Sequence, residues 1–346
     1  MGVSIAVALC THNGAQFVEE QLRSILDQTT PPQQIVISDD ASTDDTVELA
    51  RAMVSGRAAE PGHPPIEIIV LRNPEALGVA RNFEAAILAT SSDLVALSDQ
   101  DDIWRPDRLA MALPEFESRP HLDLLFSNAR LVDAAGASID RTLFDVLEIS
   151  DADQQLLHEG GAMSLFIKRN FATGATVMFR RRLLERALPF PPNWVHDEWL
   201  GVMAAATGQV DVIDETLIDY RQHGANVIGV DFPTLRRKVE RALEPRGGRN
   251  ERLSLQFEQF ASRLESVEGL APAEVVVLAR DKAIFEAERN DLPSSRLRRI
   301  RRIIAANRRD GYSRFASQGR LDIVRDLLQP IGPRSSACDS ANSPAP

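Results

Sequence analysis

Two aspartates separated by one residue stand directly after a short apolar stretch. The stretch Leu94–Leu97 is expected to be a strand, and Ser98–Asp102 follows it as Ser-Asp-Gln-Asp-Asp. Alternate residues of an extended chain point the same way, so Asp99 and Asp101 can face one ligand together. Carboxylate oxygens suit Mg²⁺ or Mn²⁺, and a protein that supplies one or two of them leaves positions for water and phosphate oxygens. The alternative is that Asp101 and Asp102 cap a following helix.

Polar residues also follow two earlier apolar runs. Ser4–Leu9 leads to Thr11–Gly14, and Gln34–Ser38 leads to Asp39 and Asp40. In an open parallel sheet, ligands lie beyond the carboxyl ends of the strands. If the three strands are neighbours, many carboxylates converge on one cleft. They would repel each other unless a cation neutralises them.

Strands and helices alternate over roughly the first 110 residues, which indicates an α/β fold with a parallel sheet and crossover helices. The expected strands are Ser4–Leu9, Gln34–Ser38, Ile66–Leu71, Leu94–Leu97, Asp123–Leu131, Ala175–Phe179, Gln209–Ile213 and Thr216–Tyr220. The expected helices are Phe17–Leu26, Val47–Val54, Val79–Leu88 and Asp197–Thr207. We expect three parts: residues 1–230, a helical and charged region over 231–329, and a disordered tail over 330–346.

Composition narrows the class of protein. The 346 residues carry a formal net charge of -11, which disfavours general nucleic-acid binding because phosphate contacts need clustered Lys and Arg. Cys10 and Cys338 are too few for a disulfide framework or a cysteine zinc site, which indicates a reducing compartment. No stretch is long enough for a signal peptide or a spanning helix. We expect a cytoplasmic protein, at most peripheral at the inner face of the plasma membrane.

Several segments form a more specific pattern together than any of them does alone. They are Ala8–Gly14, Gln21–Gln28, Ile35–Thr46, Asn73 with Gly78–Asn82, Ser98–Trp104, Thr173–Thr176, His196–Trp199 and Tyr220–Val227. Over about residues 4 to 230, this set resembles glycosyltransferase family 2. The strings Asp-Gln-Asp-Asp-Ile-Trp and Arg-Gln-His-Gly-x-Asn most resemble the branch that includes bacterial rhamnosyltransferases.

The resemblance implies a GT-A fold, with a mostly parallel nucleotide-binding sheet flanked by helices and a helical C-terminal extension. It also implies inverting transfer of a sugar from a nucleotide-diphosphate donor, dTDP-rhamnose or a UDP-sugar. The acceptor would be a saccharide or a lipid-linked molecule in bacterial surface polysaccharide biosynthesis. Residues 1–230 would then be the catalytic domain.

The resemblance also assigns roles to single residues. The donor nucleotide would contact Thr11, Asn13, Asp39, Asp40, Arg81 and Asp99. Mg²⁺ or Mn²⁺ would be held by Asp101, Asp99 and His223. Asp197 would be the general base, and the sugar or acceptor would contact Gly174, Glu198 and Trp199.

These roles have physical reasons and leave one choice open. An inverting transfer needs a base that takes the proton of the acceptor hydroxyl. The leaving diphosphate needs its charge neutralised, which a metal can do. Glu198 could be the base instead of Asp197, with Asp197 capping the helix, since neighbours on a helix point in different directions. Neutral imidazole of His223 can complete a carboxylate metal site. His196 is expected to shape the surroundings of the base.

One basic stretch has two interpretations. Arg296–Ile304 is amphipathic and rich in arginine in an otherwise acidic chain. It could lie on anionic lipid, or pack on the catalytic domain with a solvated arginine face.

Other functions fit less well. A sugar-phosphate nucleotidyltransferase usually has a basic phosphate loop after the first strand, and Thr11–Gln16 has no Lys or Arg. A non-enzymatic phospho-acceptor signalling domain needs a lysine on a later strand, and Lys168 is the first lysine in the chain. A dinucleotide-dependent oxidoreductase would show Gly-x-Gly-x-x-Gly after the first strand, and no such motif follows Ser4–Leu9.

Overall fold

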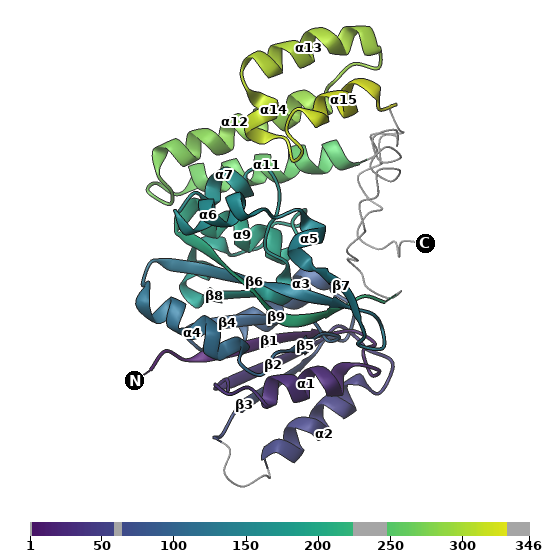
Figure 1. Cartoon of the computed structure of the whole chain (residues 1–346), viewed down its shortest axis with the longest axis vertical. Coiled ribbons are helices and arrows are strands. Elements are labelled where there is room, and N and C mark those ends of the chain that lie inside the picture. Colours follow the sequence, from purple (N-terminus) through teal and green to yellow (C-terminus); the bar gives the residue numbers. More distant parts are fainter. Residues whose placement is uncertain (1, 59–63, 224–247, 331–346) are drawn as a thin grey trace. The chain divides into compact units, whose positions relative to one another are not determined.

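A computed structural model of the chain describes residues 2–58, 64–223 and 248–330 (Figure 1). The described residues divide into two compact units. The first unit is drawn from residues 1–162, 170–190 and 194–231, and the second from residues 163–169, 191–193 and 232–346.

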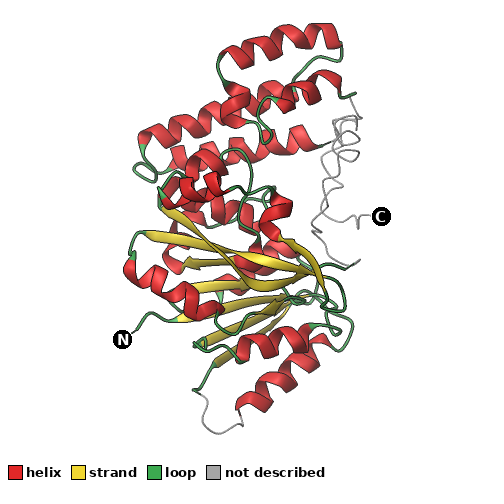
Figure 2. Cartoon of the chain, in the orientation of Figure 1, coloured by secondary structure: helices red, strands yellow, loops and turns green. Residues whose placement is uncertain are grey.

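Within the described residues, nine strands of the first unit form one sheet (Figure 2). They are β1 (Ile5–Thr11), β2 (Gln34–Asp39), β3 (Glu67–Arg72), β4 (Leu94–Ser98), β5 (Ile103–Trp104), β6 (Leu122–Val132), β7 (Ser138–Thr142), β8 (Val177–Arg180) and β9 (Gln209–Arg221). Their order is β3-β2-β1-β4-β8-β6-β9-β5, with β7 paired to β6. The run from β3 to β4 is parallel throughout. Beyond it, β8 pairs antiparallel with β4 and β6, and β6 pairs parallel with β9.

The centre of the parallel half is buried on both faces. Every residue of β1, β2 and β4 is buried, and these strands consist mostly of Val, Ile, Leu and Ala. Continuous apolar runs of this kind are typical of parallel strands covered by helices on both sides. The register places Thr11 of β1 beside Asp39 of β2, and Leu9 beside Ser98 of β4. The carboxyl ends of the three strands therefore lie at one edge of the sheet.

Helices cover both faces of this sheet (Figure 1). They are α1 (Val18–Leu26), α2 (Thr46–Ala58), α3 (Val79–Leu88), α4 (Arg108–Ser118), α5 (Leu143–Leu147), α6 (Asp151–His158), α8 (Leu184–Ala187) and α9 (His196–Thr207). Two 3₁₀ turns, η1 (Gly174–Thr176) and η2 (Arg181–Leu183), flank β8, and α7 (Ala162–Phe166) begins at the boundary between the units. One core joins β1 and β2 to α1, α2 and α4. On the other face, α3 packs on β1 and β2 and also contacts α9.

The expected parallel sheet with crossover helices is confirmed. Most expected strands end within one or two residues of the observed ends, β5 and β7 were not expected, and two expected segments differ in a further way. Gln209–Ile213 and Thr216–Tyr220 are one strand, β9, because the pairing with β6 shifts around Asp214 and continues. Extra residues in a bulge interrupt the ladder locally without ending the strand. The strand expected from Ala175 begins at Val177, since the residues before it form η1.

The second unit is helical. Its described helices are α11 (Arg249–Ser266), α12 (Ala273–Asn290), α13 (Arg296–Arg308), α14 (Gly311–Phe315) and α15 (Leu321–Leu328). Phenylalanines of α11, α12 and α14 form its apolar core, with Phe257, Phe260, Phe285 and Phe315 all buried. The expected tail, apart from Pro330, and the first part of the expected helical region lie outside the described residues.

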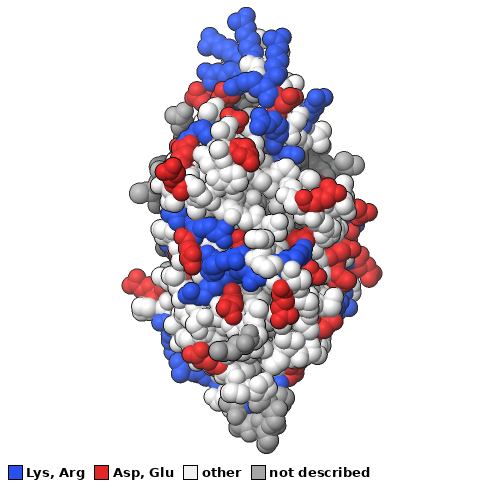
Figure 3. All heavy atoms as spheres, turned by 90° about the vertical axis from the view of Figure 1, so that its left-hand side faces the viewer, with Lys and Arg blue, Asp and Glu red and all other residues white. Residues whose placement is uncertain are grey.

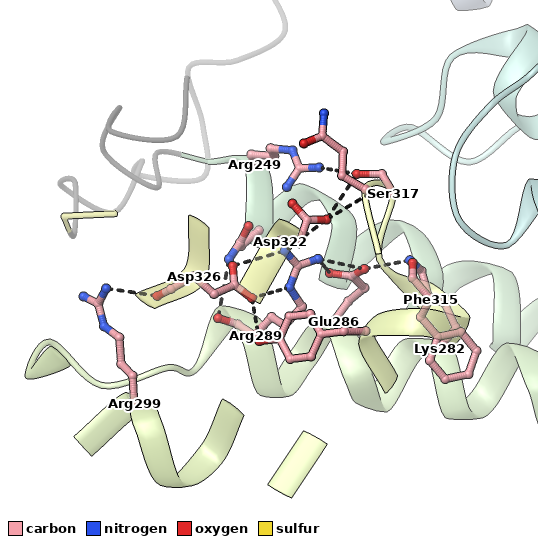
Figure 4. Close-up of polar contacts among 12 residues, drawn as sticks. Arg249, Lys282, Glu286, Arg289, Arg299, Phe315, Ser317, Asp322 and Asp326 are labelled. Carbon is pink, nitrogen blue, oxygen red and sulfur yellow. Dashed lines mark hydrogen bonds and ion pairs between the residues drawn. The ribbon is translucent and has the colours of Figure 1, made fainter. Parts of the chain in front are cut away.

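A cluster of buried charges, here called the ionic cluster, joins α12 to α15 (Figure 4). Lys282 Nζ donates to Glu286 Oε1 at 2.7 Å, and Arg289 Nε donates to Asp326 Oδ2 at 2.7 Å. Asp322 lies 3.8 Å from Arg289 and is also buried. Buried charges persist in proteins when they are paired and hydrogen-bonded. Asp322 and Asp326 of α15 therefore hold that helix against Arg289 of α12.

Across the described ranges, no helix combines the length and the apolar character that a bilayer crossing requires.

Candidate active site

The three polar strand ends come together as the sequence predicts. Thr11 Oγ1, at the end of β1, donates to Asp39 Oδ1 at 2.8 Å, and both residues are buried. The next residue of the β2 end, Asp40, donates its backbone N–H to the Thr11 carbonyl at 2.8 Å. Because β4 pairs with the other side of β1, the Asp99–Asp102 loop leaves the sheet at the same edge.

The loop after β1 is tied to the loop after β4. The side chain of Gln100 accepts from the His12 N–H at 2.8 Å and donates to the His12 carbonyl at 3.0 Å. A Cβ atom on Gly14 would lie 2.1 Å from Gln100 Oε1, so only glycine leaves room for this pairing. Gln100 was not singled out from the sequence, although it is the middle residue of the Asp-Gln-Asp triplet.

The same loop is also tied to the loop after β2. Asn13 donates its backbone N–H to Ser42 Oγ at 2.8 Å, and its side-chain oxygen accepts from the Thr43 N–H at 2.9 Å. Asn13 takes a positive φ of 48°, a conformation that asparagine tolerates better than most residues. These bonds fix the relative positions of the two loops predicted to contact a nucleoside.

Asp39 and Asp40, both predicted to contact the nucleotide, already accept hydrogen bonds from backbone N–H groups of the protein. Asp39 accepts from the Ser42 N–H at 2.9 Å. Asp40 accepts from the backbone N–H groups of Leu77 and Gly78 at 2.6 and 2.9 Å, which holds the turn that leads into α3. Each carboxylate has further lone pairs that a ligand can use. Arg81, on the first turn of α3, pairs with Glu84.

Asp101 and His223 meet directly. Asp101 Oδ2 and His223 Nε2 are 2.7 Å apart, and the two side chains are 15% and 11% exposed. The His223 ring stacks on Phe17 of α1, with ring centroids 4.7 Å apart. The contact joins the loop after β4 to the segment after β9. Both of its residues, Asp101 and His223, were predicted as metal ligands. The rest of that motif, Gly224–Val227, lies outside the described residues.

Arg221 is a residue of this site that sequence reasoning missed. It is 3% exposed and donates its Nε to the Asp101 carbonyl at 2.8 Å and its Nη2 to Glu20 at 2.7 Å. Its backbone N–H donates to Asp102 Oδ1 at 3.1 Å. Arg221 therefore braces the acidic loop against α1. The available signal was its place two residues before His223 in the same motif, on the same side of an extended chain.

The acidic loop carries more negative charge than its surroundings neutralise. Desolvation, with Asp101 and Asp197 adding to it, raises the pKa of Asp99 to about 7. Burial raises the pKa of Asp102 well above its usual range, and its Oδ2 has no hydrogen-bond partner among the described residues. Arg108 lies over the Trp104 ring at 3.7 Å, and burial lowers its pKa to about 9. Such a loop favours protons or a cation.

The donor atoms present fit a divalent cation that needs additional ligands. In the described part of the chain, no three or more His, Cys, Asp or Glu side chains are placed to hold a metal by themselves. Asp101 and His223 supply two converging donors, and Asp99 lies two residues before Asp101. Carboxylate and imidazole donors suit Mg²⁺ or Mn²⁺, which commonly keep waters and phosphate oxygens as their remaining ligands.

The predicted base lies at the start of α9. Asp197 Oδ2 accepts from the Gly174 N–H at 2.9 Å, and Oδ1 accepts from the Glu198 N–H at 2.7 Å. Burial raises the pKa of Asp197 to about 7, and the neighbouring Glu198 adds to the rise. A carboxylate with a pKa near neutral is well matched to proton transfer at neutral pH.

His196 lies beside Gly174, the residue whose N–H donates to the Asp197 carboxylate. It is buried and stacks on Phe83 with ring centroids 3.8 Å apart, and its ring nitrogens have no hydrogen-bond partner within the described ranges. Burial lowers its pKa to about 3, so the ring is neutral. A Cβ on Gly174 would lie 2.8 Å from His196 Nε2, so glycine is needed for Gly174 to approach Asp197 this closely.

Trp199 does not lie where a sugar could stack. Its side chain is fully buried, and its Nε1 donates to the Ala187 carbonyl at 2.7 Å. Trp194 packs against it, with ring centroids 5.4 Å apart. The helical face that carries Trp199 belongs to the core, so we leave Trp199 out of the acceptor site proposed below.

A half-parallel sheet covered by helices, with polar residues at its strand ends and an acidic loop after β4, is the arrangement of the GT-A class of glycosyltransferases. A solved structure supports this fold: the mannosyltransferase PcManGT of Pyrobaculum calidifontis, in complex with GDP-Man and Mn2+. It matches 89% of this chain and 76% of its own, with a TM-score of 0.51 and 21% identity. The expected GT-A fold, with a helical C-terminal region, is confirmed.

The glycosyl transferase family 2 model matches residues 6–188. The chain belongs to this family, which confirms the resemblance of its motifs. It is 26% identical to the dTDP-rhamnosyl transferase RfbG of Shigella flexneri, over 65% of this chain and 74% of that protein. It is 28% identical to the putative teichuronic acid biosynthesis glycosyltransferase TuaG of Bacillus subtilis, over 40% of this chain and 51% of that protein. The chain spans 60% to 66% of the length of the first curated relatives that it matches.

Proposed function

We propose that this chain is an inverting, metal-dependent glycosyltransferase of bacterial surface polysaccharide assembly. One observation carries the proposal. Asp101 Oδ2 and His223 Nε2 converge at 2.7 Å in the loops that follow β4 and β9. Burial raises the pKa of the neighbouring Asp99, and the charges of Asp101 and Asp197 add to the rise. That site is at the edge of the sheet where ligands of parallel α/β folds bind.

The donor would bind at the ends of β1 and β2. Thr11, Asn13, Asp39 and Asp40 would hold the base and ribose, and Arg81 would lie near the nucleotide. The bonds from Asn13 to the loop after β2 support this, because they place both loops before a ligand arrives. The similarity to RfbG favours dTDP-rhamnose, with a UDP-sugar as the second candidate.

Asp101 and His223, with Asp99, would hold Mg²⁺ or Mn²⁺ next to the diphosphate. Bound there, the ion would neutralise the charge that develops on the leaving nucleoside diphosphate. Arg221 would keep the acidic loop in place through its bonds to Asp101 and Glu20. That PcManGT was solved with Mn2+ is consistent with a divalent metal.

Asp197 would take the proton of the acceptor hydroxyl as that oxygen attacks the anomeric carbon. The attack comes from the face opposite the leaving diphosphate, so the anomeric configuration inverts and no covalent enzyme intermediate forms. The N–H groups of Gly174 and Glu198 hold the carboxylate in one orientation. Glu198 is the alternative base, and we favour Asp197 because its two anchored oxygens and its pKa of about 7 suit proton transfer.

The acceptor would be a saccharide or a lipid-linked molecule, bound near Gly174 and Glu198. The similarity to TuaG supports a role in cell-surface polysaccharides. Work on such acceptors would place the enzyme in the cytoplasm, at the inner face of the plasma membrane.

A screen of nucleotide-sugars by thermal shift, with and without Mn²⁺, tests the proposal. A true donor should raise the stability of the wild type by about 3 kcal/mol at a hundred times its Kd, and only when Mn²⁺ is present. Asp101→Ala should lose this response, and Asp281→Ala, at a partly exposed aspartate of α12, should keep it. No response to any nucleotide-sugar, or an equal response in Asp101→Ala, would refute the metal-dependent donor site. The anomeric configuration of the product, read by NMR, tests inversion.

A further inference from the structure

Helix α13 presents apolar side chains outward. Leu297, Ile300 and Ile304 are 78%, 39% and 46% exposed, at the spacing i, i+3, i+7 that places them on one helical face. The opposite face carries Arg299, Ile303 and Ala306, which are buried in the second unit. Packing of this unit therefore does not account for the outward row, since the helix is already held by its other face.

The outward face of α13 also carries unpaired positive charge. Arg298, Arg301 and Arg308 are exposed, and none of them forms an ion pair or hydrogen bond with a described residue. Residues 296–328 contain ten arginines and three aspartates, in a chain whose net charge is -11. Figure 3 shows Lys and Arg side chains gathered at the top of the view, where α13 lies in Figure 1. We call Leu297, Ile300 and Ile304 with these three arginines the α13 face.

The ionic cluster keeps acidic groups away from this surface. Asp322 and Asp326 of α15 are fully buried, and Arg289 pairs with both of them (Figure 4). The outward side of α15 is then apolar as well, with Leu321 and Val324 69% and 51% exposed. Two of the three aspartates of residues 296–328 are thus hidden from solvent, and the exposed charge of α13 and α15 is almost purely positive.

We propose that the α13 face binds an anionic phospholipid surface. Apolar side chains of a helix that lies in the membrane interface insert below the headgroups, while arginines on either side meet the phosphates. Neither part suffices alone: the arginines alone would suit any polyanion, and the apolar row alone would suit any apolar partner. Their presence on one face matches the layered chemistry of an anionic lipid surface. The inference stands on this unit alone and does not depend on sugar transfer.

Flotation of the full chain with lipid vesicles tests the proposal. Vesicles of phosphatidylcholine with phosphatidylglycerol should bind the wild type, and vesicles of phosphatidylcholine alone should bind it far less. Raising the salt to about 1 M should release the protein, because the screening length falls to about 3 Å. Binding that is absent, or equal on the two kinds of vesicle, would overturn the proposal.

Surface variants separate the two parts of the face. Arg301→Gln with Arg308→Gln should weaken binding about thirtyfold, since each arginine near an anionic surface contributes about a fivefold change. The triple variant Leu297→Ser, Ile300→Ser, Ile304→Ser should weaken it at least about tenfold. These side chains are exposed, so folding should be retained, which circular dichroism can check.

A matched control uses exposed apolar residues of the same unit. Leu255→Ser with Val277→Ser changes side chains that are 47% and 60% exposed on α11 and α12, and should leave vesicle binding unchanged. Equal loss in this control would overturn the assignment to α13. So would a triple variant that binds vesicles normally but loses a self-association that the wild type shows in solution, because the row would then be a contact between copies. RNA binding that is as strong as vesicle binding, and that the serine substitutions leave unchanged, would show a general polyanion site instead. Donor binding in the thermal-shift screen is read separately, so either proposal can fail alone.

Discussion

Replacing Asp197 with asparagine separates the chemical role of this residue from its structural role. The amide has the size of the carboxylate but can accept a hydrogen bond at one oxygen only. One of the two N–H groups, of Gly174 or of Glu198, therefore loses its acceptor, which costs about 1–2 kcal/mol of stability. The proton acceptor is lost completely. General base catalysis contributes about 10²–10⁴ in rate, so the barrier should rise by about 3–5 kcal/mol.

The stability of the same variant should depend on pH in a definite direction. Burial raises the pKa of Asp197 from 3.8 to about 7 in the folded chain. Protonation of this group therefore stabilises the fold fully below the unfolded pKa, and that stability is lost as pH rises through 7, up to about 4 kcal/mol. Asparagine does not ionise. Without metal or donor, Asp197→Asn should be the less stable protein near pH 4 and the more stable one near pH 8, by about 2 kcal/mol.

Two assays read these outcomes. Release of nucleoside diphosphate gives kcat and the donor KM, and kcat of Asp197→Asn should fall at least about a hundredfold with the donor KM unchanged. Glu198→Gln is the matched control and should keep most of its activity. Thermal unfolding at several pH values in chelator gives the stability difference. An active Asp197→Asn, a Glu198→Gln variant with the larger loss, or a stability difference that does not change with pH would refute the assignment of the base.

Three further expectations concern the pH profile, the loop after β1 and the metal site. With saturating metal, kcat/KM of the wild type should decline as pH falls below about 7, since the base must be ionised, and a decline only near pH 4 would contradict the pKa of Asp197. Gly14→Ala should lose about 1–3 kcal/mol of stability and weaken donor binding, because its methyl would lie 2.1 Å from Gln100 Oε1. Gly56→Ala, on α2 with open space around it, should gain about 0.5–1 kcal/mol; equal melting shifts in both would contradict the steric argument. Calorimetry with Mn²⁺ and a nucleoside diphosphate should show at least tenfold weaker binding for Asp101→Asn than for the wild type.

Much of the donor side of the site follows from the sequence. Parallel strands covered on both faces read as continuous apolar runs, so β1, β2 and β4 were located within one or two residues of their observed ends. The polar residues after them could then be placed together, because the carboxyl ends of neighbouring parallel strands share one edge. The structure joins Thr11 to Asp39 as this argument requires.

Other features depend on packing that no local pattern reports. The two expected short strands from Gln209 are one strand, because the pairing with β6 continues past a bulge. An aromatic residue on a helix can face a ligand or the core, and only the neighbours of Trp199 show that it belongs to the core. The bracing role of Arg221 depends on side-chain contacts with residues far apart in the sequence, Glu20 and Asp101.

Anomalous scattering from Mn²⁺ in crystals of the full chain, grown with dTDP or UDP, would locate the proposed metal and donor sites. We expect one strong peak within bonding distance of Asp101 Oδ2 and His223 Nε2, in contact with the diphosphate. We also expect the nucleoside at the ends of β1 and β2, beside Thr11 and Asp40. A peak remote from Asp101, or a nucleotide bound away from these strand ends, would contradict the proposal.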